Sequence, residues 1–207
     1  MEVNPRQKFF QERGYVIIRK FLSEDAVEIL KNAFLIQRDN DYYLKASADA
    51  TNNTFGDCQI PESYAAYSSL CFESLLLSST PKIEICTGKS LYPTYSYARI
   101  YNNGAELVPH LDRPSCEISA TICISKTINY PICFAYDSKK IEVELEPGDA
   151  IIYSGCDLIH WREKYNGEDG GHMQVFIHYV EQNGPHKDFI FDKRPLLGLP
   201  SVSEGKY

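Results

Sequence analysis

The sequence lacks the paired cysteines that mark a disulfide framework or a zinc–thiolate site. Its seven cysteines are an odd number, and no two of them are spaced as Cys-x-x-Cys. Several lie in apolar runs, as Cys123 does between Ile122 and Ile124. Cysteines in such surroundings are typical of free, buried thiols in a reducing compartment. We therefore expect neither disulfides nor a thiolate-bound zinc ion.

Long apolar segments and clusters of positive charge are missing too. No run approaches the roughly 20 apolar residues that span a bilayer, and the N-terminus has no apolar stretch of the signal-peptide type. The formal net charge is −7, and the lysines and arginines form no basic run. We therefore expect a soluble, cytoplasmic protein without a membrane partner. The charge also argues against nucleic acid as a partner, and the oligomeric state is left open.

The length of 207 residues fits one domain. A chain of this size buries roughly 70% of its unfolded surface, so its core needs no cross-link for support. Helical patterns dominate residues 1–90, β-like patterns dominate 91–180, and 181–207 is rich in turn residues. We expect these parts to form a single domain over 1–207, as N-terminal support, core and C-terminal tail.

The first 37 residues contain two helical patterns around one short strand. Residues 5–13 predict a helix that ends at Gly14, and 15–18 predict a buried strand. Ser23 is a favourable N-cap, and two acidic residues follow it at the positive end of the next helix. Apolar residues then recur at intervals of three and four to about residue 37, which predicts a core-facing stripe.

The next segment is polar and irregular. We expect a long loop over 38–61, and whether this loop is a lid over a site is left open. Residues 62–77 predict a further helix, with Tyr64, Tyr67 and Leu70 available for packing.

After residue 90 the chain changes to short β-like runs separated by turn residues. Such a series after two helices predicts a mainly β protein, with flanking helices packed on a small barrel or jelly roll. The eight predicted strands are 94–101, 107–110, 117–125, 131–136, 141–146, 149–153, 158–164 and 172–180.

A histidine and an aspartate lie two residues apart at the end of the second of these strands. Residues i and i+2 of a strand point to the same face, so His110 and Asp112 project together into the barrel. His160 follows on the seventh strand, which lies near the second one in a jelly roll. Two histidines and one carboxylate on one face of a metal are the arrangement of non-haem iron(II) oxygenases. His178 is the alternative third ligand.

Several motifs resemble a known family. His110-Leu111-Asp112, the Pro-Gly-Asp-Ala turn at 147–150 and His160 at this separation look like the 2-oxoglutarate-dependent iron(II) dioxygenases, over nearly the whole chain. Residues 10–23 are similar to the start of phytanoyl-CoA-dioxygenase-like members. Residues 97–104 are closer to the prolyl-hydroxylase-like branch.

The resemblance implies a double-stranded β-helix (jelly-roll, cupin-like) core. It also implies iron(II) as cofactor, 2-oxoglutarate as cosubstrate and O2 as oxidant. The implied reaction is hydroxylation of a small molecule or a protein side chain, with 2-oxoglutarate converted to succinate and CO2. In such a reaction the cofactor carries the chemistry, and we expect no catalytic residue beyond the three metal ligands.

The sequence departs from this family at the cosubstrate anchor. The family places an arginine or lysine about ten residues after the distal histidine, but Gly170 stands there. Alternation along the last strand puts His172 and Gln174 on the face opposite to the aliphatic residues, toward the interior. We expect these two residues to bind the distal carboxylate of 2-oxoglutarate, with a hydroxyl from Tyr101. Arg162, on the same face as His160, is the main alternative.

Two further cations, Arg113 and Lys126, are weaker candidates for the anchor. The missing arginine or lysine keeps two other functions open. One is a cupin-like metal enzyme that uses the same ligands without 2-oxoglutarate, since two histidines and a carboxylate also suit zinc. The other is a relative that binds a ligand without turnover.

Overall fold

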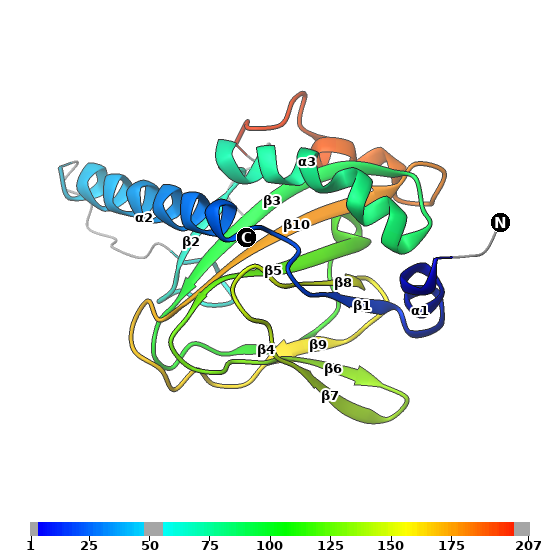
Figure 1. Ribbon diagram of the computed structural model, residues 1–207. Coiled ribbons are helices and arrows are strands. Elements are labelled where there is room, and N and C mark those ends of the chain that lie inside the picture. Colours follow the sequence, from blue (N-terminus) through cyan, green and yellow to red (C-terminus); the bar gives the residue numbers. More distant parts are fainter. Residues whose placement is uncertain (1–3, 48–55, 201–207) are drawn as a thin grey trace.

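A computed structural model describes residues 4–47 and 56–200 of the chain. Within them, two antiparallel sheets face each other (Figure 1). The larger sheet has the order β1-β8-β5-β10-β3-β2, and the smaller one has the order β4-β9-β6-β7. The strands are β1 (Tyr15–Ile18), β2 (Tyr64–Tyr67), β3 (Leu91–Tyr101), β4 (Leu107–His110), β5 (Ile118–Lys126), β6 (Ile132–Tyr136), β7 (Lys139–Val143), β8 (Ala150–Ser154), β9 (His160–Arg162) and β10 (His172–Glu181).

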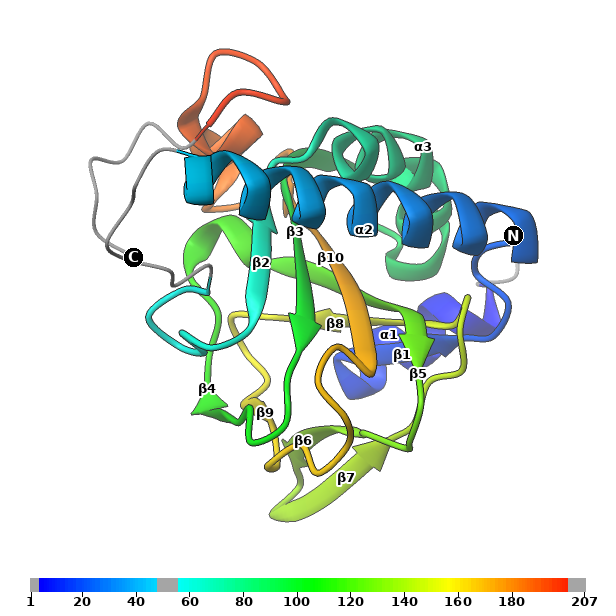
Figure 2. The same ribbon diagram turned by 90° about the vertical axis from the view of Figure 1, so that its left-hand side faces the viewer.

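The helices lie mainly on the outer face of the larger sheet, as Figures 1 and 2 show for α2 and α3. None of the helices in the described part is long and apolar enough to cross a membrane. The predicted fold class, a mainly β jelly roll with flanking helices, is confirmed. The helical elements are α1 (Pro5–Arg13), α2 (Glu24–Ser47) and α3 (Leu70–Thr87), with short 3-10 segments η1 (Pro114–Cys116) and η2 (Lys187–Lys193).

The larger sheet is covered on both faces, and the two faces differ in chemistry. Val175 and Ile177 of β10 pack with Phe34 of α2 and Leu76 of α3 in the main hydrophobic core. The residues that alternate with them on β10 point to the space between the two sheets, which we call the barrel interior. This division follows from the two-residue period of a strand and places the polar residues of β10 inside the barrel.

Two predicted elements are wrong. Residues 38–47 continue α2 rather than forming a loop, and the remainder of the predicted loop lies partly in 48–55, outside the described residues. The polar end of α2 is held by tertiary contacts, because Tyr64 donates a hydrogen bond to Asp41 and its ring packs against Tyr42. Such contacts override the weak local signal.

The predicted helix over 62–77 is a strand followed by a helix. Tyr64–Tyr67 form β2, which pairs with β3 at the edge of the larger sheet. Ser68 has a left-handed φ of 58°, which ends the strand, and Ser69 occupies the N-cap position of α3. The four residues of β2 alternate between buried and half-buried positions, so their packing follows the sheet period rather than the helix period.

Candidate metal and cosubstrate site

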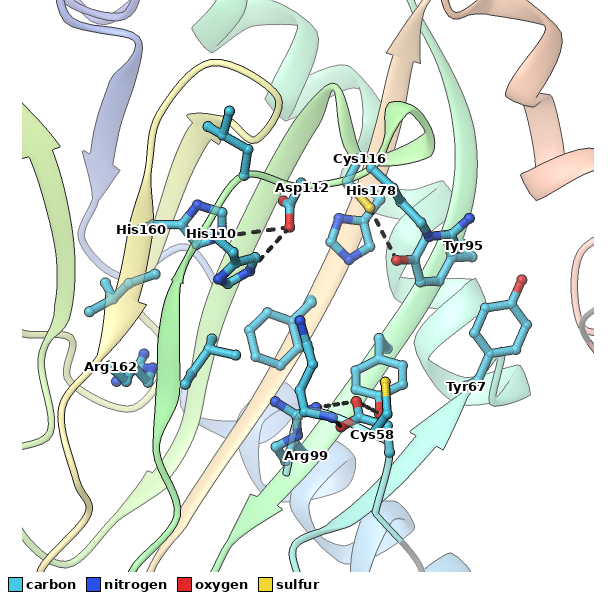
Figure 3. A pocket seen from close by; sticks show the side chains of 18 of the residues that line it. Cys58, Tyr67, Tyr95, Arg99, His110, Asp112, Cys116, His160, Arg162 and His178 are labelled. Carbon is cyan, nitrogen blue, oxygen red and sulfur yellow. Dashed lines mark hydrogen bonds and ion pairs between the residues drawn. The ribbon is translucent and has the colours of Figure 1, made fainter. Parts of the chain in front are cut away.

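The barrel interior opens at the ends of β4 and β9. These strands are antiparallel neighbours, and their register places His110 directly opposite His160. Asp112 lies two residues beyond the end of β4, and its Oδ1 lies 3.7 Å from Nε2 of His110 and 3.6 Å from Nε2 of His160. We call these three residues the His–Asp–His cluster (Figure 3). The sequence-predicted ligands are thus brought together.

Both imidazoles of the cluster are held in one tautomer. Nδ1 of His110 lies 2.9 Å from the carbonyl oxygen of Val108, and Nδ1 of His160 lies 2.9 Å from that of Leu158. A carbonyl oxygen can only accept a hydrogen bond, so each Nδ1 carries the proton. Each Nε2 therefore turns its lone pair toward Asp112, as in metal-binding histidines whose other nitrogen is oriented by the protein.

The charges of the cluster favour a cation between its members. Burial alone raises the pKa of Asp112, but the imidazoles of His110 and His160 outweigh burial and hold this pKa well below its usual range. Burial lowers the pKa of His110, yet the neighbouring Asp112 raises it above the ordinary value. The three lone pairs thus converge on one point where positive charge is stabilised.

The spacing of the cluster fits a metal ion. Two atoms that are each about 2.1 Å from one ion can lie at most about 4.2 Å apart, and the observed separations are 3.6 and 3.7 Å. Two imidazole nitrogens and one carboxylate oxygen suit iron(II), with coordination positions left open for other ligands. His110, Asp112 and His160 could therefore hold such an ion.

Two residues that sequence reasoning did not identify support Asp112. Ser119 on β5 lies with its Oγ 3.0 Å from Oδ2 of Asp112. The carbonyl oxygen of Gly155 accepts from the backbone N–H of Asp112 at 2.9 Å. A Cβ atom on Gly155 would overlap Oδ2 of Asp112 and the carbonyl oxygen of Cys116. No motif in the sequence marks these supporting positions.

A second polar group lies deeper in the barrel interior. Arg162 is 1% exposed, and its guanidinium donates hydrogen bonds to the carbonyl oxygen of Tyr130 and, at 2.7 Å, to Oε1 of Gln174. Tyr101 on β3 lies directly opposite His172 on β10, with their ring centroids 5.6 Å apart. We call Tyr101, Arg162, His172 and Gln174 the inner polar cluster.

Several buried atoms of the inner polar cluster lack a partner in the described structure. They are the hydroxyl of Tyr101, both ring nitrogens of His172 and Nε2 of Gln174. Burial, together with the charges of Arg162 and Lys126, lowers the pKa of His172 well below its usual value, so its ring is neutral. Arg162 is therefore the cation of this cluster, and the other three members can supply neutral donors to a buried anion.

The two weaker anchor candidates are engaged elsewhere. Lys126 pairs with Glu146 at 2.7 Å. Arg113 forms a two-pronged ion pair with Asp192, at 2.7 and 2.8 Å. Among the predicted cations, only Arg162 lies inside the inner polar cluster.

A cavity of about 650 Å³ adjoins both clusters. Arg99 of β3 and Asp57 form an ion pair on its wall, which sequence reasoning did not identify. His178 of β10 lies beside Asp112, and its ring packs at a tilt of 32° against Tyr95 with 4.5 Å between the centroids (Figure 3). The remaining described residues that line the cavity include Cys58, Gln59, Tyr67, Tyr97, Leu107, Leu111, Arg113, Cys116, Ile132, Tyr153, Phe176 and Pro200.

Solved structures share this architecture. An alpha-ketoglutarate-dependent non-haem epimerase of nogalamycin biosynthesis, SnoN, has a TM-score of 0.67 at 15% identity, covering 95% of this chain and 91% of its own. HygX from Streptomyces hygroscopicus, solved with nickel and 2-oxoglutarate bound, has a TM-score of 0.66 at 12% identity, covering 88% and 89%. A Pseudomonas putida prolyl-4-hydroxylase has a TM-score of 0.61 at 14% identity, covering 84% and 96%.

The chain has the fold of the 2-oxoglutarate-dependent iron oxygenases. The predicted resemblance is thereby confirmed at the level of the fold. No protein-family model and no curated protein sequence matches the chain. Identities of 12% to 15% carry no information on the substrate, so the function is argued from the two clusters.

Proposed function

We propose that this protein is an iron(II)- and 2-oxoglutarate-dependent oxygenase. The observation that carries the proposal is the pairing of the His–Asp–His cluster with an inner polar cluster, which has one buried cation and several donors that find no partner in the described part of the chain. When bound, iron(II) with 2-oxoglutarate and O2 supplies the oxidising power for hydroxylation, and succinate and CO2 are the coproducts. The residues of the chain bind, orient and shield these groups.

The His–Asp–His cluster holds the metal. Nε2 of His110, Nε2 of His160 and a carboxylate oxygen of Asp112 are its three protein ligands. The hydrogen bonds from Nδ1 to backbone carbonyls keep both rings oriented, and the hydroxyl of Ser119 orients the carboxylate.

The inner polar cluster receives the distal carboxylate of 2-oxoglutarate. Arg162 supplies the charge, which the neutral ring of His172 cannot do. A planar guanidinium binds a carboxylate through directed, charge-assisted hydrogen bonds. Tyr101, Gln174 and His172 add neutral donors around it. The expected His172–Gln174 anchor thus becomes a secondary part of an anchor centred on Arg162.

The prime substrate is a small molecule or a protein side chain that enters the cavity of about 650 Å³. This volume lies in the range of small-molecule sites. The free cysteines and the acidic net charge are compatible with a cytoplasmic protein that does not bind nucleic acid.

An anaerobic spectrum tests the proposal. Iron(II) and then 2-oxoglutarate are added to the metal-free protein without oxygen, and the visible spectrum is recorded. We expect a charge-transfer band only after both additions, and its loss in His110→Ala. Bound iron without a band would instead favour a cupin-like metal enzyme that does not use 2-oxoglutarate. No iron binding would favour a non-catalytic relative.

A further inference from the structure

We propose that His178 binds a hydroxyl group of an uncharged, ring-bearing small-molecule substrate. This inference rests on the proposed function, because it places the substrate beside the metal of the His–Asp–His cluster. It names a substrate class and a recognition residue that the proposed reaction does not by itself require.

His178 lies at the cavity beside the predicted metal ligands. This residue belongs to β10, which lies between β3 and β5 in the larger sheet, and its side chain lines the same cavity as the predicted metal ligands. One of its ring nitrogens, a carboxylate oxygen of Asp112 and the sulfur of Cys116 lie within 4.8 Å of one another. Figure 3 shows the ring between Asp112 and Tyr95. A substrate group bound there is adjacent to the reacting centre.

The hydrogen bonds around Ser119 fix the tautomer of the His178 ring. Nδ1 of His178 lies 2.9 Å from the hydroxyl oxygen of Ser119. That hydroxyl has one proton, and it lies 3.0 Å from Oδ2 of Asp112 and 3.1 Å from the carbonyl oxygen of Cys116, which can only accept. The hydroxyl therefore accepts from Nδ1–H of His178, and Nε2 keeps a lone pair. A lone pair of this kind selects a substrate group that donates a hydrogen bond, as an alcohol does.

Aromatic rings line the cavity that His178 reaches. The rings of Tyr67 and Tyr95 stack with 5.1 Å between their centroids, and the ring centroids of Tyr97 and Phe176 lie 6.3 Å apart. The hydroxyls of Tyr67 and Tyr97 are not free for a substrate, because they donate to Asp192 and Asp57 at 2.6 Å. These tyrosines offer ring faces, which favour an apolar, ring-bearing body.

The charged side chains on the cavity wall pair with one another or with Asp192. Outside the two clusters, the charged side chains among the described lining residues are Asp57, Arg99 and Arg113. Each is in an ion pair: Asp57 with Arg99, and Arg113 with Asp192. A charged substrate would have to break one of these pairs to find an opposite charge. The wall therefore suits an uncharged molecule.

The test compares two probes that differ only in donor ability. Indan-2-ol donates a hydrogen bond, whereas indan-2-one has the same ring system and only accepts. Each is titrated to 10 mM into the anaerobic protein with iron(II) and 2-oxoglutarate, and the shift of the charge-transfer band gives its dissociation constant. A proline-containing peptide is the third probe. His178→Phe keeps a ring against Tyr95 but removes both nitrogens, and His186→Phe in the C-terminal segment is the matched control.

We expect indan-2-ol to bind at least about tenfold more tightly than indan-2-one, which is the effect of one well-made hydrogen bond in a buried site. The preference is retained in His186→Phe and lost in His178→Phe. Equal binding of both probes, no binding of either, or tighter binding of the peptide would overturn the proposal.

A second measurement separates this inference from the proposed function. In the zinc-loaded protein, labelled with 15N at histidine, indan-2-ol should shift the Nε2 resonance of His178 and indan-2-one should not. Absence of the charge-transfer band together with this shift would reject the proposed function and keep the His178 assignment. A normal band with an unchanged Nε2 resonance would reject the assignment alone.

Discussion

The His–Asp–His cluster and the inner polar cluster occupy the same barrel interior, but their atoms are satisfied in different ways. In the first, both Nδ1 atoms and Oδ2 of Asp112 have protein partners, and the side chains of His110 and Asp112 are 21% and 15% exposed. In the second, the four residues are at most 1% exposed, and several donors have no partner among residues 4–47 and 56–200. The first cluster is pre-oriented, and the second is incomplete.

The difference indicates two ways of preparing a binding site. Backbone carbonyls near the mouth of the barrel set the histidine tautomers before any ion arrives. Deep in the barrel, burial of polar atoms without partners costs about 1–3 kcal/mol for each group. An anion that accepts from these donors removes that cost on binding, so the groups that lower the stability of the fold strengthen the binding of the anion.

Removal of one ligand from the pre-oriented cluster has the largest expected effect. His160→Ala should weaken iron(II) binding by more than about 100-fold, since even the partners of metal ligands contribute 10- to 100-fold. Calorimetric titration of the metal-free protein measures the affinity. His178→Ala is the control for the alternative third ligand, and it should stay within a few-fold of the original affinity. Weak iron binding in His178→Ala alone would reverse the assignment.

Removal of the buried cation is the next largest effect. Arg162→Leu should weaken 2-oxoglutarate binding by at least about 30-fold, because loss of a buried charged partner costs about 2–5 kcal/mol. Iron(II) affinity measured without 2-oxoglutarate should not change. Titration of the charge-transfer band gives the cosubstrate affinity, with Arg38→Leu on α2 as a matched control. Unchanged 2-oxoglutarate affinity would move the anchor away from Arg162.

A substitution at Gly155, which packs closely against Asp112, should have a smaller effect on iron(II) binding and should act only on the His–Asp–His cluster. Gly155→Ala places a methyl group against the Asp112 carboxylate and a backbone carbonyl. Overpacking of this kind costs about 1–3 kcal/mol, and the displaced carboxylate should weaken iron(II) binding by roughly tenfold. Denaturant unfolding and metal titration measure the two effects. A variant that unfolds earlier but binds iron normally would show that Gly155 supports the fold and not the ligand.

The incomplete cluster predicts a trade-off of stability against affinity. His172→Phe replaces a ring with two unpartnered nitrogens by an apolar ring, so the metal-free protein should gain about 1–2 kcal/mol in free energy of unfolding. The affinity for 2-oxoglutarate should fall by roughly tenfold if His172 donates to the carboxylate. Denaturant unfolding without ligand checks the first effect. A loss of stability would contradict the incomplete state of this cluster.

The pH dependence of the same variant is the smallest effect. The pKa of His172 is lowered by burial, whereas an unfolded histidine has a pKa of about 6.5. Below that pH the histidine binds a proton in the unfolded state but not in the folded state. His172 therefore lowers the free energy of unfolding as the pH falls from about 7 toward 5, and it has no such effect above about pH 7. His172→Phe should lose less stability than the original protein over this range. Thermal unfolding at pH 7 and pH 5 measures the difference.

The local patterns that predicted the fold correctly have simple periods or strong caps. Gly14 has a φ of 73° and ends α1 as expected. The β-like runs after residue 90 correspond to β3–β10 with shifts of a few residues at their ends. The continuation of α2 to Ser47 and the strand β2 were missed, because the contacts of Tyr64 with α2 and the pairing of β2 with β3 are long-range.

The His-x-Asp spacing and the alternation along β10 were sufficient to propose the ligands and to place His172 and Gln174 in the barrel. Both rest on the two-residue period of a strand, which is a local property. The ionisation state of His172 is not local. It follows from burial and from the charge of Arg162 on another strand. The proposal of Arg162 rather than His172 as the charged anchor therefore needed the three-dimensional arrangement.

Sequence patterns alone were therefore enough to predict the fold class and the strand series, and to propose three metal ligands, because all three inferences depend on period, caps and spacing. Only the tertiary structure decided which side chains surround them. Ser119 and Gly155 contact Asp112, and Asp57 forms an ion pair with Arg99. His178 reaches the cavity because β10 pairs with strands that are distant in the sequence. Burial and charge at a site are sums over neighbours from many segments, and no local pattern specifies those sums.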